Sequence, residues 1–342
     1  MSATTAHAAP VRRVSGRLQG VDSVRLLSIF AVVLAHALSE RELSHVITFE
    51  SIVSQLTHFS VAFSFTAGGY LLGRRSTSSV PSAFWRVAWR VGPAFLTWLL
   101  VYNILIPHSI PDHINLRYIV VLFGTGGSGY HLWFLPTYLM SAAIVLLLTT
   151  YLRWNQAFAV TMLLYLAGLA IGSYSGLFSP SGQATVLGLT IARGGPFFGP
   201  ICVLYGFWFA QTNRATSLRA GLALLLGGAA LQLTEAYVLN VNHLIHFVSN
   251  DFLLGTVAFG IGAFSLSLHL PSSSPPVQFV ARFGRLSFGI YSVHLLFVLA
   301  FRAVLAPDTF IKKLGIALLA LIASVVVTMM LEQVRRFRPV AA

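Results

Sequence analysis

Long apolar runs constrain the fold of this chain more than any other feature of its 342 residues. A helix needs about 20 consecutive, mostly apolar residues to cross the hydrocarbon core of a bilayer, and runs of this length recur along the whole sequence. The sequence therefore predicts an all-α, polytopic membrane helix bundle with about ten transmembrane helices. These spans are predicted near 24–39, 52–73, 88–106, 131–150, 156–174, 193–210, 218–238, 250–269, 286–305 and 313–331.

The composition agrees with a membrane protein. Hydrophobic residues make up 56% of the chain, charged residues only 9%, and the mean hydropathy is +0.79, which is too apolar for a soluble domain of this size. Residues 1–19 are predicted to form a disordered basic arm and residues 20–338 a single transmembrane domain, with 271–276 as a linker between spans. Internal repeats are not apparent, which argues against a secondary transporter built from matched halves.

The net charge of +13 is distributed as in a membrane protein. If the N-terminus is cytoplasmic, most basic residues fall on the cytoplasmic side, which is the positive-inside bias and predicts cytoplasmic termini and no nucleic-acid partner. These residues are Arg12, Arg13, Arg17, Arg25, Arg74, Arg75, Arg86, Arg90, Arg153, Arg214, Arg219, Arg282, Arg285, Arg335, Arg336 and Arg338. The basic arm and the run ending in Ala35-His36-Ala37 also resemble a signal peptide, but the charges of Asp22 and Arg25 interrupt its start.

Arg25 and His36 are the first functional candidates. Eleven positions are about three helical turns, so both side chains fall on one helix face about 16 Å apart along the axis. Charged or imidazole groups cost about 3 kcal/mol or more in the bilayer core and usually line a protein interior. His36 could accept a proton from a hydroxyl as a general base, or it could be a buried histidine with a purely structural hydrogen bond.

Arg86 and Arg90 are four residues apart and also share one helix face. Together with Arg25 they could bind an anionic group such as a phosphate, because guanidinium groups match phosphate oxygens bidentately. The alternative is that their side chains extend to lipid headgroups as ordinary positive-inside residues.

Glu235 is the acidic residue embedded most deeply in a predicted span, where it could orient a base or meet a sugar hydroxyl. His58, His131 and His294 lie within or near spans and are candidates for the same cavity as His36. No metal site is predicted, because neither H-x-x-x-H nor E-x-x-H occurs on a span, and the single cysteine, Cys202, excludes an intramolecular disulfide.

Gly124-Thr-Gly-Gly-Ser-Gly129 matches the spacing of a dinucleotide fingerprint, G-x-G-x-x-G. That fingerprint requires a strand before it and a helix after it within a βαβ unit. Here the segment falls in a loop between predicted spans, so it predicts a turn between helices.

Five short motifs in order resemble those of the membrane acyltransferase 3 family of bacterial integral-membrane O-acyltransferases. They are Asp22-x-x-Arg25 followed by His36, the segment Val61–Leu72 around Gly69-Tyr70, Arg86-x-x-x-Arg90-x-x-Pro93, His131-Leu-Trp133-Phe, and Ser287-x-x-x-Tyr291-x-x-His294. The chain departs from the family pattern around Ala67 and Gly68, where the family usually has a serine.

The resemblance implies an acyltransferase of the bacterial cytoplasmic membrane. It implies transfer of an acyl group, commonly acetyl from acetyl-CoA as co-substrate, to a hydroxyl of a cell-surface or lipid-linked carbohydrate. His36 and Arg25 would then be catalytic, with His36 as general base, and Arg86 and Arg90 would bind the CoA phosphates. The motif residues His131, Trp133, Tyr291 and His294, with Glu235, would lie around the cavity or the acceptor, and His131, Tyr291 and His294 are candidates for stabilising the oxyanion.

Some family members carry a fused extracytoplasmic domain, and without one this chain is expected to act alone or to pass the acyl group to a separate protein. Polysaccharide assembly proteins are therefore expected partners besides acyl-CoA, the carbohydrate acceptor and the lipid bilayer, and no bound cofactor is expected. Two alternatives remain: a transporter or flippase of a glycan intermediate, and a non-catalytic membrane scaffold. Neither alternative involves covalent chemistry.

Overall fold

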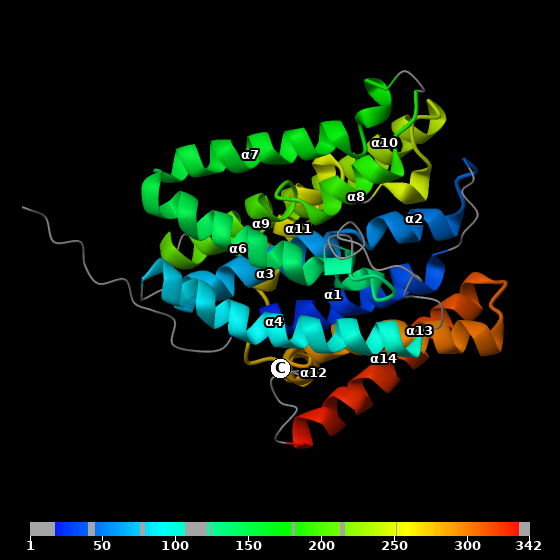
Figure 1. The fold of residues 1–342 in the computed structure, drawn as a ribbon. Coiled ribbons are helices and arrows are strands. Elements are labelled where there is room, and N and C mark those ends of the chain that lie inside the picture. Colours follow the sequence, from blue (N-terminus) through cyan, green and yellow to red (C-terminus); the bar gives the residue numbers. More distant parts are fainter. Residues whose placement is uncertain are drawn as a thin grey trace, which may run out of the picture.

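The structure is a computed structural model that describes residues 18–39, 45–75, 79–106, 122–123, 125–179, 182–212, 216–250 and 252–334. Within these ranges all regular structure is helical, which confirms the predicted all-α class (Figure 1). The predicted basic arm lies outside the described residues up to position 17, as do Gly124, Arg214, Arg335, Arg336 and Arg338.

The α-helices are α1 (Gln19–Leu38), α2 (Phe49–Leu56), α3 (Phe59–Arg75), α4 (Val80–Leu105), α6 (Phe134–Tyr151), α7 (Trp154–Ile171), α8 (Val186–Gly194), α9 (Gly199–Thr212), α10 (Leu218–Val241), α11 (Leu254–Ser267), α12 (Pro275–Gly284), α13 (Ser287–Leu305) and α14 (Phe310–Gln333). The described ranges also contain three short 3-10 helices, η1 (Tyr130–Trp133), η2 (Ser175–Leu177) and η3 (Phe247–Ser249).

Seven helical segments in the described part of the chain are long and apolar enough to cross a membrane, so the predicted count of ten is not confirmed. They are Gln19–Leu38, Tyr130–Tyr151, Trp154–Ile171, Leu187–Thr212, Leu218–Val241, Ser287–Leu305 and Phe310–Gln333. The other three predicted spans correspond to α3 with 17 residues, α11 with 14 residues, and α4, which carries two arginines.

Two of the predicted elements differ from the structure for local reasons. The predicted span 52–73 is divided between α2 and α3, with Thr57 and His58 between them. The predicted linker 271–276 instead leads into α12, whose first turn contains Pro275 and Pro276. Proline is favoured in the first helical turn, where its missing N–H group would have no intrahelical partner, so this proline pair starts a helix.

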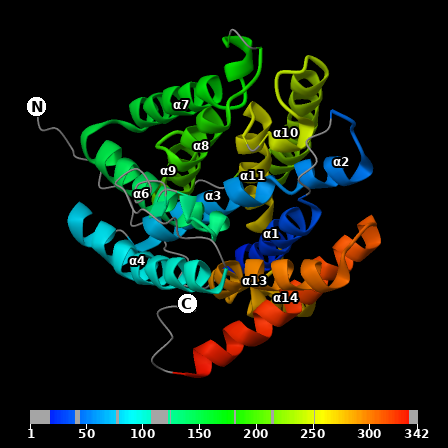
Figure 2. The same ribbon diagram turned by 45° about the vertical axis from the view of Figure 1, so that its right-hand side comes forward.

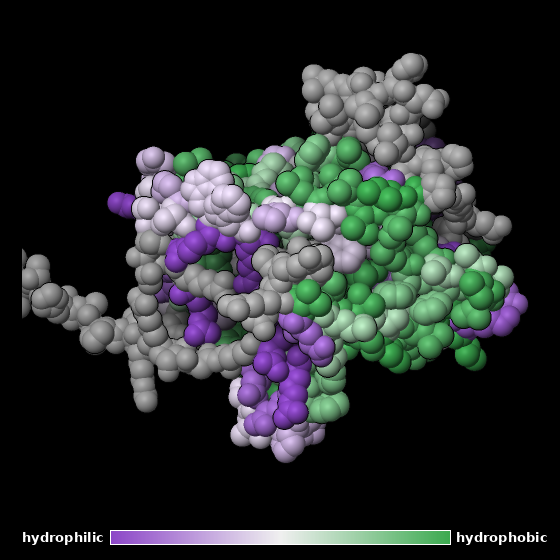
Figure 3. All heavy atoms as spheres, turned by 60° about the horizontal axis from the view of Figure 1, so that its bottom comes forward, coloured by the Kyte–Doolittle hydropathy of each residue, from purple (hydrophilic) through white to green (hydrophobic). Residues whose placement is uncertain are grey.

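The helix α1 lies in the middle of the bundle, where it packs against α3, α12, α13 and α14. Figures 1 and 2 both show α7 on one side of the molecule and α14 on the other, with α1 and α3 between them. On the face drawn in Figure 3, hydrophilic residues gather toward one end and hydrophobic residues cover much of the rest. Exposed apolar side chains such as Ile311 and Val304, which are 79% and 80% exposed, are suited to contact with lipid.

Glycines allow α3 and α9 to pack at close range. A Cβ atom at Gly69 would overlap the carbonyl of Val203, and one at Gly206 would overlap the carbonyl of Thr66. Small residues at such contacts let helix backbones approach closely, which is a main source of packing energy between helices in membranes. This contact fixes the position of α3, which forms one wall of the cavity described below.

Gly206→Ala is expected to lower the free energy of unfolding by about 1–3 kcal/mol, because the added methyl group must push α3 and α9 apart. The thermal unfolding midpoint of the purified protein in detergent measures this effect. Gly227→Ala is the matched control, since a Cβ atom at Gly227 meets no atom within 4 Å. Equal midpoints for the two variants would contradict the packing role of Gly206.

Candidate active site

A cavity of about 830 Å³ lies between α1, α2, α3, α4 and α6 and is the natural candidate for a functional site. Residues of α1 that line it include Arg25, Ser28, Val32 and His36. They follow one another at helical spacing, so a single stripe of α1 forms one wall, as the sequence pattern indicated. The walls from α3 and α4 include Ser64 and Gly68, and Arg86 and Arg90.

Three arginines, Arg25 near the start of α1 and Arg86 and Arg90 on α4, line the cavity, and we call the part that they line the arginine end. Arg86 and Arg90 are exposed, whereas Arg25 is half-buried and lies 3.4 Å from the carboxylate of Asp22, with which it forms an i,i+3 ion pair. The buried Asp22 thus holds Arg25 at the start of the cavity wall. The three residues that the sequence suggested for an anion all line the cavity.

Three histidines meet farther along the cavity. The ring centroid of His36 lies 6.2 Å from that of His131 and 5.3 Å from that of His294, and the His131 and His294 centroids are 4.9 Å apart. His36 is half-buried, while His131 and His294 are buried. His36 and His131 line the cavity, and His294 stands behind them. In the described ranges, no group of three histidine, cysteine or acidic residues is arranged to hold a metal ion.

Hydrogen bonds to backbone carbonyls hold this histidine cluster in place. Nδ1 of His294 lies 2.7 Å from the carbonyl oxygen of Tyr291, and the Tyr291 hydroxyl donates to the carbonyl of His131. Arg302 on α13 donates to the carbonyls of His36 and Ser39, at 3.2 Å for His36. His36 is in the last turn of α1 and Ser39 directly follows the helix, where carbonyls lack intrahelical donors, so Arg302 caps the helix that carries His36.

The other end of the cavity is next to α2, and we call it the α2 end. Hydroxyl groups of Thr48, Ser51, Ser54, Thr57 and Ser249, which lie on or near α2 and on η3, line this part. Trp133 is on its wall, and the guanidinium of Arg193 lies 5.6 Å above the Trp133 ring, a cation–π arrangement. Glu50 is also on the wall and pairs with Lys313 at 2.6 Å. An aromatic surface with many hydroxyl groups suits a polar organic ligand.

The departure from the family pattern at Gly68 has a local explanation. Tyr138 on α6 donates its hydroxyl to the carbonyl of Gly68, at 3.1 Å, and its ring occupies the space where a Cβ atom at position 68 would lie. A serine at this position would collide with Tyr138. The hydroxyl group at this part of the wall therefore comes from Tyr138, which also lines the cavity.

Glu235 does not line the cavity, so the sequence-based expectation for this residue is wrong. Its carboxylate accepts hydrogen bonds from the backbone N–H groups of Leu254 and Gly255, at 3.3 and 2.8 Å, and from the hydroxyl of Tyr174. Burial and the bond to Glu235 raise the pKa of Tyr174, so its phenol remains a donor. The first N–H groups of α11 lack intrahelical partners, and Glu235 supplies an acceptor for them.

Glu235→Ala is expected to lower the free energy of unfolding by about 1–2 kcal/mol, because the variant loses the acceptor that caps α11. The turnover number for acyl transfer per folded molecule is expected to stay unchanged, because Glu235 lies outside the cavity. Thermal unfolding and turnover, measured on the same preparation, test this. Glu235→Gln, which keeps one acceptor oxygen, should have an intermediate midpoint. A tenfold drop in turnover with an unchanged thermal unfolding midpoint would show that Glu235 takes part in the reaction.

Several residues of this site were not predicted from the sequence. Ser28, Tyr130 and Arg193 line the cavity, and Arg302 caps α1. Ser28 could have been found, since it is three residues from Arg25 and eight from His36 on the same helical face. The other three come from distant segments, and hydropathy alone does not distinguish a cavity-lining arginine from one beside the lipid headgroups.

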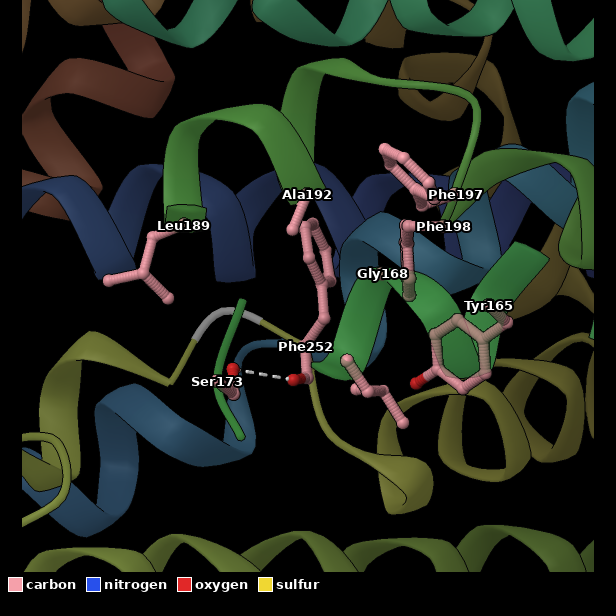
Figure 4. Close-up of a pocket in the computed structure, with 9 residues that line it drawn as sticks. Tyr165, Gly168, Ser173, Leu189, Ala192, Phe197, Phe198 and Phe252 are labelled. Atoms are coloured by element: carbon pink, nitrogen blue, oxygen red, sulfur yellow. Dashed lines mark hydrogen bonds between the residues drawn. The ribbon is translucent and has the colours of Figure 1, made fainter. Parts of the chain in front are cut away.

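A second, much smaller gap is a packing defect. Figure 4 shows it beside Phe197, Phe198 and Phe252, with the hydroxyl of Ser173 donating to the carbonyl of Phe252 at 2.8 Å. Its volume of about 10 Å³ holds at most one water molecule. Phe252 separates this gap from the large cavity, because it lines both.

Comparisons with known proteins agree with the motifs. Residues 18–332 match the family model described as an acyltransferase domain. Two curated relatives from Enterococcus faecalis, each named an amino-acid racemase, are 26% identical over 212 residues and 27% identical over 214 residues. The alignments cover 58% and 57% of this chain but only 30% and 28% of the relatives, so the chain spans less than a third of their length. No solved structure matches the chain.

Proposed function

The chain belongs to the acyltransferase 3 family, and on that basis we propose that it is an integral-membrane O-acyltransferase. The donor is an acyl-CoA, with acetyl-CoA as the first candidate, and the acceptor is a hydroxyl group of a cell-surface or lipid-linked carbohydrate. His36 is the general base, and Arg25, Arg86 and Arg90 bind the phosphates of the donor.

One observation supports this proposal above all others: a single cavity joins the arginine end to the histidine cluster. Coenzyme A has the same division, with phosphates at one end and a thioester at the other, connected by a long pantetheine arm. Arg25 and His36 are 11 residues apart on α1, which is about 16 Å along the helix axis. A donor with its phosphates at the arginines extends its acyl group toward His36.

The chemistry follows from these positions. The acceptor oxygen forms a bond to the thioester carbonyl carbon while its proton moves to a ring nitrogen of His36, giving a tetrahedral oxyanion and an imidazolium. The oxyanion collapses and the carbon–sulfur bond breaks. The departing thiolate takes the proton from His36, so the products are the acyl ester and free CoA thiol, and the histidine is neutral again.

The α2 end of the cavity supports binding of the acceptor. Its hydroxyl side chains provide donors and acceptors for a sugar, and Trp133 provides a flat apolar surface for a sugar ring. Donor and acceptor would then bind to different parts of one cavity. Polysaccharide assembly proteins would supply or receive the acceptor.

The test is turnover of labelled acetyl-CoA by the purified protein in detergent, with release of CoA thiol and transfer of label to cell-envelope glycans followed together. Transfer that depends on His36 supports the acyltransferase. Absence of both thiol release and transfer, with glycan movement across vesicle membranes, would favour the transporter alternative. Mass spectrometry of surface glycans from cells with and without the gene identifies the acceptor.

We also propose that the protein lies in the bacterial cytoplasmic membrane with both termini on the cytoplasmic side, since basic residues cluster at the arginine end and acyl-CoA is a cytoplasmic metabolite. Reporter fusions after residue 334 are expected to be active only as cytoplasmic reporters. A C-terminal tag that is accessible only from outside the cell would contradict the proposed orientation and with it donor binding from the cytoplasmic side.

A further inference from the structure

A pair of serines lines the cavity at a level of α1 between Arg25 and His36. Ser28 is three residues after Arg25 and eight before His36, which is about 4.5 and 12 Å along the helix axis. Ser64 of α3 lies beside Ser28, with their hydroxyl oxygens 3.3 Å apart. Both residues line the cavity, but Ser28 is only 2% exposed, whereas Ser64 is half-buried. Ser64 is therefore the member of the pair that a ligand in the cavity can contact.

The hydrogens of both hydroxyl groups are used within the protein. The Ser64 hydroxyl donates at 2.7 Å to the carbonyl of Ser60, four residues earlier in α3. The Ser28 hydroxyl donates to the same carbonyl at 3.0 Å. A hydroxyl group has one hydrogen and two lone pairs, so the Ser64 oxygen keeps a lone pair for a further donor. The pair thus offers an acceptor to a ligand, and the ligand group that fits it is a donor such as an amide N–H.

The neighbouring wall of α1 indicates which donor group this is. From Arg25 onward, Ser28, the apolar Val32 and His36 line the cavity in turn, at helical spacing. The donor of the proposed reaction has a matching order of groups. Its phosphates are followed by two amide groups with methylene groups after each, and then by the thioester. Because Ser28 is closer along the axis to Arg25 than to His36, the pair meets the amide farther from the sulfur, between pantoate and β-alanine.

We propose that Ser64, held by its contacts with Ser28 and Ser60, binds the pantetheine arm of the donor. Its oxygen accepts a hydrogen bond from the N–H group of the amide between pantoate and β-alanine. This inference rests on the proposed acyltransferase function. With the phosphates at the arginines, this contact fixes the course of the arm, so that the acyl carbonyl is held at His36. No bond forms or breaks at Ser64, which is a binding and positioning residue.

The first test needs neither a variant nor turnover. Calorimetry measures the binding of three probes to the purified wild-type protein in detergent. They are CoA, an analogue with oxygen in place of the N–H group of the amide between pantoate and β-alanine, and a control analogue with this replacement at the amide next to cysteamine. The first analogue is expected to bind about threefold to tenfold more weakly than CoA, the effect of one neutral hydrogen bond. The control analogue is expected to bind about as tightly as CoA.

Ser64→Ala tests whether this serine is the acceptor. The variant is expected to bind CoA about threefold to tenfold more weakly than wild type, and to bind CoA and the first analogue about equally. Ser324→Ala is the matched control. Ser324 is buried in α14, donates at 2.6 Å to the carbonyl of Ala320 four residues earlier, and lies outside the cavity. It is expected to distinguish the two ligands as wild type does. A merely structural role of Ser64 would not remove this distinction.

The outcomes separate the role of Ser64 from the proposed function. Equal binding of CoA and the first analogue by wild type would overturn the role of Ser64 alone. The same difference between these ligands in wild type and in Ser64→Ala would also overturn it, as is expected if the hydroxyl donates to a ligand carbonyl instead. Failure of wild type to bind CoA and to release CoA thiol from acetyl-CoA would overturn the proposed function, and this role with it.

Discussion

His36→Asn is expected to lose acyl transfer by about a hundredfold to ten-thousandfold, the contribution typical of a general base. Asparagine keeps a hydrogen-bonding side chain of similar reach but cannot take up a proton near neutral pH, so it separates the catalytic role from the structural one. His36→Ala is expected to be equally inactive. The measurement is CoA thiol release by the purified variants, together with glycan acylation in cells that lack the native gene.

The control for this experiment is His269→Asn, since His269 is exposed and its ring nitrogen Nε2 lies 2.7 Å from the carbonyl of Thr216, outside the cavity. Membrane levels and thermal unfolding midpoints of all variants need to match wild type. Near-normal transfer by His36→Asn would make His36 a structural residue. The base would then be sought at the two histidines beside it, His131 and His294.

The Arg86→Ala, Arg90→Ala double variant is expected to show the second large effect, a loss of affinity for acyl-CoA. Charge-assisted hydrogen bonds are typically worth about 1.5–3 kcal/mol each. Both arginines line the cavity but are exposed, so water and salt screen their charges, and we expect the lower end of this range, about tenfold per residue and a hundredfold together. Titration of CoA binding to the purified proteins measures the effect.

Two further variants test whether the loss of affinity is specific to guanidinium groups that line the cavity. Lysine at both positions should restore binding only in part, because an ammonium group lacks the planar fork that matches phosphate oxygens. Arg219→Ala is the matched control, an exposed arginine in the first turn of α10 that does not line the cavity. Wild-type affinity in the double alanine variant would leave Arg86 and Arg90 as ordinary residues beside the lipid headgroups.

The helical content and the wall formed by α1 could be predicted from the sequence because both depend on short-range patterns. Apolar runs of about 20 residues indicate helices whatever surrounds them. The 3.6-residue period places Arg25 and His36 on one face, and both line the cavity. The number of spans was harder to predict, because hydropathy does not reveal where a run breaks, as between α2 and α3.

Glu235 shows the limit of predicting a role from composition. A carboxylate within an apolar run indicates that the protein supplies hydrogen-bond donors for it. These donors are at the start of α11, where backbone N–H groups at Leu254 and Gly255 need acceptors. A structural cap and a catalytic carboxylate have the same sequence signature, and only the packing of α10 against α11 distinguishes them.

The sequence by itself therefore determined the class of fold, the stripe of α1 and the paired arginines of α4, since each follows from spacing within one helix. Only the tertiary structure decided what surrounds His36. The Tyr291 hydroxyl meets the carbonyl of His131 across 160 residues, and Arg302 meets that of His36 across 266. Contacts at such separations depend on how helices pack side by side, and small residues such as Gly69 and Gly206 set that packing through the space they leave empty.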